Sequence, residues 1–187
     1  SEIEKLIENG DEKDHIKALD ELINLSQIEE NQNENNARIK LILSSFKKIS
    51  YRKRFSKAPP VLLKEILTPS STPRLLLNCL KAMENYSIET DAYNLALLYK
   101  KQTSQKIKNS IARIVSNCRS KEAQELILSE LLEKPISNTK TLKIMSKGTL
   151  ICGQNIAKII LQAVIQSDYK NKSFPYLMKL LSQCFHT

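Results

Sequence analysis

A lysine precedes three of the four cysteines of this chain by twelve residues. These pairs are Lys106 and Cys118, Lys140 and Cys152, and Lys172 and Cys184. The same register continues towards the N-terminus onto Arg74 and Arg38, so five segments open with a basic residue at spacings of 36, 32, 34 and 32 residues. A period in this range is typical of stacked supersecondary units rather than of one globular core.

The composition favours helices as the repeating elements. Only three glycines and six prolines occur in 187 residues, which is too few for the many tight turns of a β-sandwich. We therefore predict an all-α fold of about five antiparallel helical hairpins after a short helix at 2–9. The first helices are expected near 12–26, 59–67, 90–101, 121–133 and 154–166. The second helices are expected near 36–50, 73–86, 104–118, 138–151 and 173–185.

Helix boundary signals agree with this division. Pro73 is suited to a first helical turn, and Thr103-Ser104 and Ser137-Asn138 provide N-cap side chains that can accept hydrogen bonds from free amides. Gly148 indicates a close helix contact or a break near the end of the fourth second helix.

The second helices share an apolar stripe, which we call the seam. Positions 1, 5, 8 and 12 after the basic residue fall within about 60° of a helix surface at 100° per residue. In successive repeats they are Ile39, Leu43, Phe46, Ser50; Leu75, Cys79, Ala82, Tyr86; Ile107, Ile111, Ile114, Cys118; Thr141, Met145, Gly148, Cys152; and Ser173, Leu177, Leu180, Cys184. Burying this seam between neighbouring hairpins is the expected source of stability.

Cations recur at two other positions of the same register. Position 0 and position 7 share one helix face, away from the seam, and together they predict two rows of cations on one surface. The candidate partner-binding residues are Arg38, Arg74, Lys81, Lys106, Arg113, Lys140, Lys147, Lys172 and Lys179. Solvated surface positions or chance periodicity in a lysine-rich chain are the competing interpretations.

A second basic feature lies between residues 47 and 57 and is interleaved with Tyr51 and Phe55. Its cations are Lys47, Lys48, Arg52, Lys53, Arg54 and Lys57. Cations that favour a helix C-terminus, a nuclear-import signal, and contact with phosphate groups all remain open for this cluster.

Charge divides the chain into two parts. Residues 1–35 hold eleven Asp or Glu and three Lys, whereas residues 36–187 hold nine acids and twenty-six Lys or Arg. We predict one helical-repeat domain over 1–187, with an acidic segment at 1–35 and a basic body at 36–187 that attracts an anionic partner. A chain that starts at Ser1 is expected to be part of a larger protein.

The cysteines and histidines do not form a metal motif. No cysteine pair has CxxC spacing, and His15 and His186 lie at opposite ends, so no metal or cofactor is expected. Cysteines at one recurring seam position are expected to be buried, reduced thiols in an intracellular protein, with the nucleus favoured over the cytoplasm. No apolar run is long enough to span a bilayer.

The hairpin length, the register and the cations that open the second helices resemble the HEAT and armadillo superfamily of α-solenoids over about residues 12–185. The resemblance implies a right-handed superhelix that serves as a binding scaffold. In that superfamily an aspartate about six residues earlier commonly pairs with the cation. The corresponding residues here are Gln32, Thr68, Lys100, Lys134 and Gln166, so none is acidic.

No catalytic constellation is present, and no phosphate-binding glycine loop can be built from Gly10, Gly148 and Gly153. We therefore expect a non-catalytic interaction scaffold whose basic face binds an acidic or phosphorylated protein segment. The alternative is nucleic-acid backbone binding along the same face. Self-association through an apolar terminal face formed by Leu177, Leu180 and Leu181 is a further expectation.

Overall fold

The computed structural model describes residues 73–84 and 91–185, together with single residues between 2 and 21. The chain forms two compact units, Ser1–Ser87 and Ile88–Thr187, and each is treated by itself. We call the second the C-terminal unit. The prediction of a single domain over 1–187, with its acidic and basic parts, stays a prediction.

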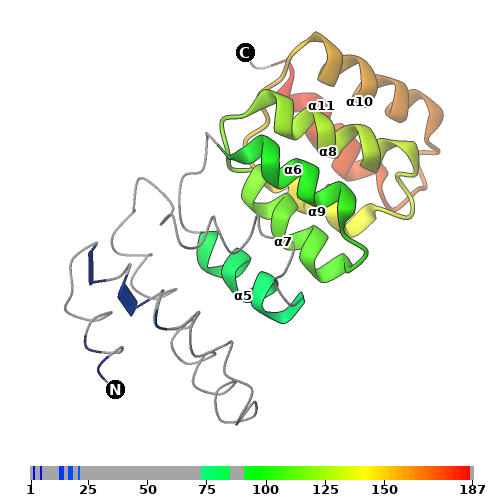
Figure 1. Cartoon of the computed structure of the whole chain (residues 1–187). Helices are drawn as coiled ribbons and strands as arrows, with labels where there is room; N and C mark the ends of the chain where they lie inside the picture. The colour runs from blue at the N-terminus through cyan, green and yellow to red at the C-terminus, as the bar shows by residue number, and fades with distance from the viewer. Residues whose placement is uncertain are drawn as a thin grey trace. The chain divides into compact units, whose positions relative to one another are not determined.

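Every regular element in the described residues is a helix, as the sequence predicted, and none of these residues lies in a strand (Figure 1). The first unit contributes α5 (Pro73–Met83), and residues 13, 14, 17, 18 and 21 are helical within the predicted helix 12–26. The predicted helices at 36–50 and 59–67 and the basic cluster at 47–57 lie outside the described residues.

The C-terminal unit contains six helices, which follow one another as three consecutive hairpins. The helices are α6 (Ala92–Lys101), α7 (Gln105–Val115), α8 (Lys121–Glu133), α9 (Thr139–Lys147), α10 (Gln154–Gln166) and α11 (Phe174–Gln183). Helix α6 packs on α7 and α10 on α11, whereas α8 and α9 pack mainly on the neighbouring hairpins. The bounds of α8 and α10 agree with the sequence prediction at both ends.

These helices pack in two layers. The first helices α6, α8 and α10 lie side by side in one layer, and the second helices α7, α9 and α11 lie side by side in the other (Figure 1). Each hairpin thus contacts the next through both of its helices. This packing is what a period of 32 to 36 residues predicts for stacked units.

The seam occupies the contact between the layers. Ile107, Ile111 and Ile114 of α7, Met145 of α9, and Leu177 and Leu180 of α11 are all buried. The first-helix layer adds Leu95, Tyr99, Ile127, Leu128 and Ile160 to the same core. Burial of these side chains stabilises the stack of hairpins by roughly 25 cal/mol for each Å² of apolar surface removed from water.

The helix α9 is shorter than the predicted range 138–151, and Gly148 explains why. A Cβ at Gly148 would lie 2.2 Å from the backbone oxygen of Ser116, so only glycine allows these two backbone segments to approach so closely. The next amide, at Thr149, donates to that Ser116 oxygen at 2.9 Å and so leaves the helical pattern. The sequence prediction of a break and a close contact at Gly148 is confirmed.

The predicted caps at Ser104 and Asn138 are confirmed in place, but their predicted hydrogen bonds are not formed. Ser104 and Asn138 are the N-cap residues of α7 and α9, yet neither side chain makes the capping hydrogen bond. The amide of Asn138 instead donates to the Leu131 carbonyl at 3.2 Å, which ties the turn back to α8. Ser120 does cap α8, since its hydroxyl accepts from the Ala123 amide.

Two expectations about the core are wrong. Cys152 and Cys184 form a disulfide with a Cα–Cα distance of 5.1 Å, so of the four cysteines only Cys79 and Cys118 are buried thiols outside a disulfide. The two bonded cysteines occupy the same register position in successive repeats, and stacking brings equal positions together. Leu177, Leu180 and Leu181 are buried against α9 and α10 and therefore do not form an exposed terminal face.

Candidate functional site

The second-helix layer carries cations and no carboxylates. Its three helices α7, α9 and α11 contain seven Lys or Arg and no Asp or Glu. By contrast, α8 in the first-helix layer contains four glutamates and one lysine. The other first-layer helices, α6 and α10, add three lysines and no carboxylate, so the first-helix layer is balanced in charge whereas the second-helix layer is net positive.

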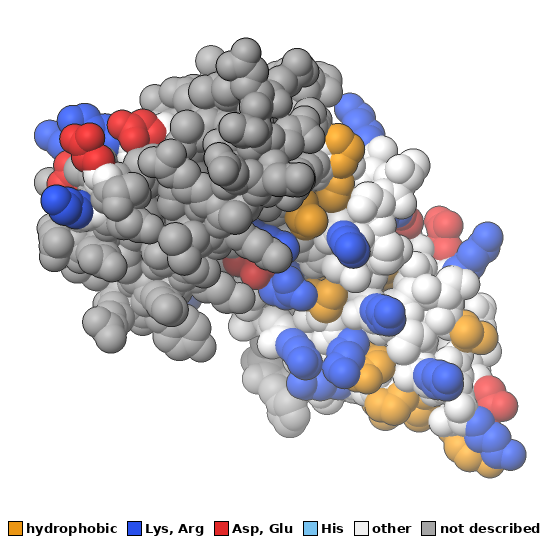
Figure 2. Space-filling view, turned by 90° about the horizontal axis from the view of Figure 1, so that it is seen from below, with side chains coloured by type: hydrophobic (Ala, Val, Ile, Leu, Met, Phe, Trp, Pro, Cys, Tyr) orange, Lys and Arg blue, Asp and Glu red, His pale blue; other side chains and the backbone are white. Residues whose placement is uncertain are grey.

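The predicted cations of this layer are all exposed. Six of them come from the sequence prediction, and Lys143 joins them because position 3 shares the face of positions 0 and 7. We call this set the basic face: Lys106, Arg113, Lys140, Lys143, Lys147, Lys172 and Lys179. Figure 2, viewed from the side on which α7 and α9 lie, shows Lys and Arg side chains spread over the surface with apolar patches between them.

Cross-helix hydrogen bonds hold the N-terminal ends of the second helices at one level. The Gln105 amide of α7 donates to the Thr141 hydroxyl of α9 at 3.0 Å, and the hydroxyls of Thr139 and Ser173 lie 2.6 Å apart. Each bonded residue neighbours a predicted cation along the chain. Lys106, Lys140 and Lys172 therefore share one level of the layer.

The other ends of these helices are tied in the same way. Besides the bond from Thr149 to Ser116, the Gln183 amide of α11 donates to the Ser146 carbonyl of α9 at 3.4 Å, and its oxygen accepts from the Leu150 amide at 2.8 Å. Arg113, Lys147 and Lys179 lie within about one turn of these contacts, and they form the second level.

A buried glutamine of the first-helix layer makes hydrogen bonds to the C-terminal ends of α7 and α9. Gln124 of α8 has no exposed surface. Its amide nitrogen lies 2.9–3.3 Å from the carbonyl oxygens of Val115, Cys118 and Thr149, and its oxygen accepts from the Ile151 amide at 2.8 Å. One side chain thus satisfies the free backbone groups at the ends of α7 and α9.

Lys108 differs from the cations of the basic face. Its ammonium group lies 2.7 Å from a Glu130 carboxylate oxygen and 4.7 Å from the centre of the Tyr99 ring. Burial, reinforced by the negative charge of Glu130, raises the pKa of Tyr99 above its ordinary value. Lys108 therefore connects α7 to α6 and α8, whereas the structure gives Lys106, Lys140, Lys147, Lys172 and Lys179 no ion-pair partner within residues 91–185.

The remaining predicted cations belong to the first unit. Lys81 is exposed on α5, and Arg74 lies in the same helix. Arg38 and the basic cluster Lys47, Lys48, Arg52, Lys53, Arg54 and Lys57 lie outside the described residues. The structure therefore brings together the cations of three second helices, from α7 to α11.

Two other features, a metal site and a membrane-spanning helix, are absent from the described residues. No group of three His, Cys, Asp or Glu side chains within them is arranged to hold a metal ion. No helix in the described part of the chain is long and apolar enough to cross a membrane.

No protein-family model, curated protein or solved structure matches this chain.

Proposed function

We propose that this chain is a non-catalytic interaction scaffold whose basic face binds an acidic or phosphorylated segment of another protein. The observation that carries the proposal is the net positive charge of the second-helix layer, with seven cations and no carboxylate on its three helices. Like charges placed side by side repel each other, and an anionic ligand relieves that repulsion. Arg38, Arg74 and Lys81 would extend the face if the register continues through the first unit.

Local helix electrostatics support a binding role for the lysines over a structural one. Lys106 and Lys140 are the second residues of α7 and α9, where the helix dipole disfavours cations. Neither helix has an acidic residue in its first turn to compensate. Residues that served stability alone would have the opposite charge at these positions.

A peptide-binding experiment tests the proposal. A fluorescein-labelled, glutamate-rich peptide should bind the full chain, and Lys140→Glu with Lys147→Glu should weaken binding at least about tenfold, which corresponds to roughly 1.4 kcal/mol. The matched control is Lys100→Glu with Lys158→Glu, which changes net charge equally on exposed positions of the first-helix layer. Equal weakening by both double variants would show that net charge alone drives binding and would contradict the proposed face.

The same face supports a second function, binding to a nucleic-acid backbone. The basic body and an isoelectric point of about 9.3 favour this alternative. Aromatic residues make up only 5% of the chain, which disfavours base stacking on single strands. Neutralising six phosphates on duplex DNA predicts a slope of about −5 in a log–log salt titration. A duplex affinity that exceeds the peptide affinity and follows this slope would favour the alternative.

We further propose that the stacked hairpins belong to a right-handed, HEAT- or armadillo-like superhelix of about five units. The two-layer packing of three hairpins and their common seam support it. Small-angle X-ray scattering of the full chain should then give a radius of gyration clearly above the roughly 16 Å of a compact globule of this length. A value near 16 Å would favour a bundle.

The cellular compartment stays a prediction. The basic stretch at 47–57 favours the nucleus, whereas the Cys152–Cys184 disulfide is more typical of an oxidising compartment.

A further inference from the structure

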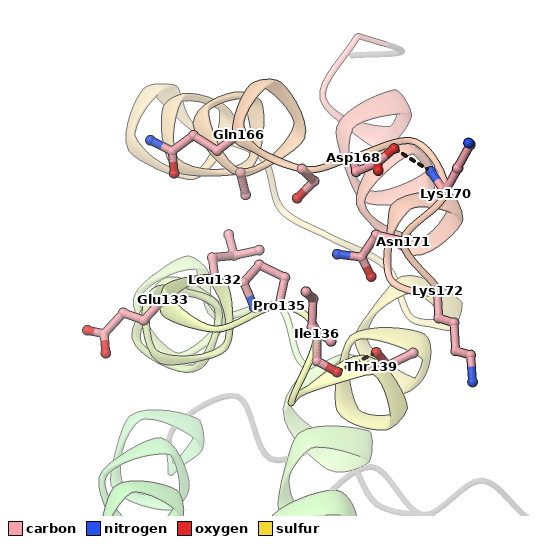
Figure 3. Close-up of a pocket in the computed structure, with 12 residues that line it drawn as sticks. Leu132, Glu133, Pro135, Ile136, Thr139, Gln166, Asp168, Lys170, Asn171 and Lys172 are labelled. Carbon is pink, nitrogen blue, oxygen red and sulfur yellow. Dashed lines mark hydrogen bonds between the residues drawn. The ribbon is translucent and has the colours of Figure 1, made fainter.

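A cleft of about 780 Å³ lies between the turn that joins α8 to α9 and the turn that joins α10 to α11 (Figure 3). Leu132, Pro135, Ile136 and Ala163 supply its apolar lining. Ile136 is 71% exposed, so part of this apolar lining faces solvent.

Hydrogen bonds fix both walls of the cleft. Ser173 is fully buried, and its hydroxyl donates to the Pro135 carbonyl at 2.6 Å, which ties one turn to the other. Within the second turn, Asn171 accepts from the Ser173 amide at 2.9 Å and Asp168 accepts from the Lys170 amide at 3.0 Å (Figure 3). A cleft with walls held in this way loses little entropy when a ligand enters.

The rim carries two acidic residues, Glu133 and Asp168, and two lysines, Lys170 and Lys172. Figure 3 shows Glu133 and Gln166 pointing away from the cleft on one side, and Lys170 and Lys172 on the opposite side. Lys172 also belongs to the basic face, and Thr139 of the lining directly precedes Lys140. The cleft therefore adjoins the basic face where α9 and α11 begin.

We infer that this cleft takes one bulky aliphatic side chain of the acidic segment that binds the basic face. The inference rests on the proposed function and adds a specificity pocket to it. Charge complementarity identifies the occupant, because the exposed Lys140 and Lys172 of the basic face lie beside the apolar lining and attract carboxylates or phosphates there, whereas Glu133 and Asp168 balance the two lysines of the rim itself. An extended acidic segment across Lys140 and Lys172 passes this rim.

Helix spacing gives the expected pattern of the segment. Neighbouring helices lie about 10 Å apart, which is close to three residues of extended chain at about 3.3 Å each. Acidic residues at the first, fourth and seventh positions of a nine-residue peptide would therefore face Lys106, Lys140 and Lys172 in turn. An aliphatic side chain beside the third acid would lie next to the cleft.

Two labelled peptides with this pattern test the inference on the full chain. Both carry glutamates at positions 1, 4 and 7 in a background of serine and glycine, and they differ only by leucine or serine at position 6. Fluorescence anisotropy should give about tenfold tighter binding for the leucine peptide, because most of its side chain leaves water. Ile136→Ser should reduce this preference to below about threefold.

Ile165→Ser is the matched control, because Ile165 is equally exposed at 73% but does not line the cleft. It should keep the tenfold preference. Equal affinity of the two peptides for the unchanged protein, or equal loss of preference in both variants, would overturn the inference while the basic face still binds. Failure of both peptides to bind would overturn the proposed function as well.

Discussion

Gly148 shows how a single residue sets the approach of two helices. Its backbone passes so close to Ser116 that a methyl group would meet a backbone carbonyl oxygen, which cannot rotate away as a side chain could. Its φ of −82° is ordinary for any residue, so the requirement is one of space alone. We expect Gly148→Ala to destabilise the protein by about 1–3 kcal/mol, measured by urea unfolding, because the ends of α7 and α9 must move apart.

Gly153→Ala is the control for this prediction. A Cβ there would meet the end of the flexible Lys121 side chain, which can move aside. Reduced entropy of the unfolded chain and a weaker N-cap for α10 act in opposite directions, so the net change should stay within about 0.5 kcal/mol. A Gly148→Ala protein as stable as Gly153→Ala would contradict the close contact.

At the scale of the element, the second helices α7 and α9 carry positive charge at their N-terminal ends, where the helix dipole disfavours cations. Replacing Lys106 and Lys140 by glutamate places an anion in the first turns of α7 and α9, so each change should stabilise the protein by about 0.3–1 kcal/mol. The same double variant should lose affinity for an acidic peptide. Thermal unfolding and peptide anisotropy on one preparation measure both effects.

Opposite signs of these two effects separate a binding role from a structural one. If the lysines stabilised the fold, their reversal would lower the melting temperature. Lys158→Glu provides the reference, because Lys158 is exposed in the first-helix layer and lies beyond the first turn of α10. It should change neither stability nor peptide affinity appreciably.

At the scale of the whole molecule, the Cys152–Cys184 disulfide closes a chain segment with a sequence separation of 32. It joins the loop before α10 to the end of α11, and thereby holds the last hairpin against the preceding one. A disulfide that closes a loop of this length stabilises the folded state by about 2–4 kcal/mol, so reduction should lower the melting temperature by about 4 °C or more.

Thiol counting checks the same bond. The protein denatured without reductant should react with two equivalents of iodoacetamide, at Cys79 and Cys118, and with four after reduction. A double variant, Cys152→Ser with Cys184→Ser, should melt at the same temperature with and without reductant. Four reactive thiols in the unreduced protein would contradict the disulfide.

The sequence predicted most of the C-terminal unit because its signals are local. Helix period, turn residues and the common phase of the basic residues depend on positions a few residues apart, and α8 and α10 were predicted with their bounds. The seam residues Ile107, Ile111 and Ile114 follow from the same periodicity. For Leu177 and Leu180 the seam prediction is right and the prediction of an exposed terminal face is wrong, and the burial of Leu181 was missed, since the helix turns its apolar stripe inwards against two neighbours.

The amino-acid sequence alone determined which residues share a helix face, because side-chain direction follows from 100° of rotation per residue. Tertiary packing decided everything that joins one repeat to another. The disulfide required α9 to end early at Gly148 and leave Cys152 in a loop beside Cys184. The cleft forms only where the α8–α9 turn and the α10–α11 turn, more than 30 residues apart in the sequence, meet through the hydrogen bond of Ser173. No local sequence pattern connects the two residues of this bond.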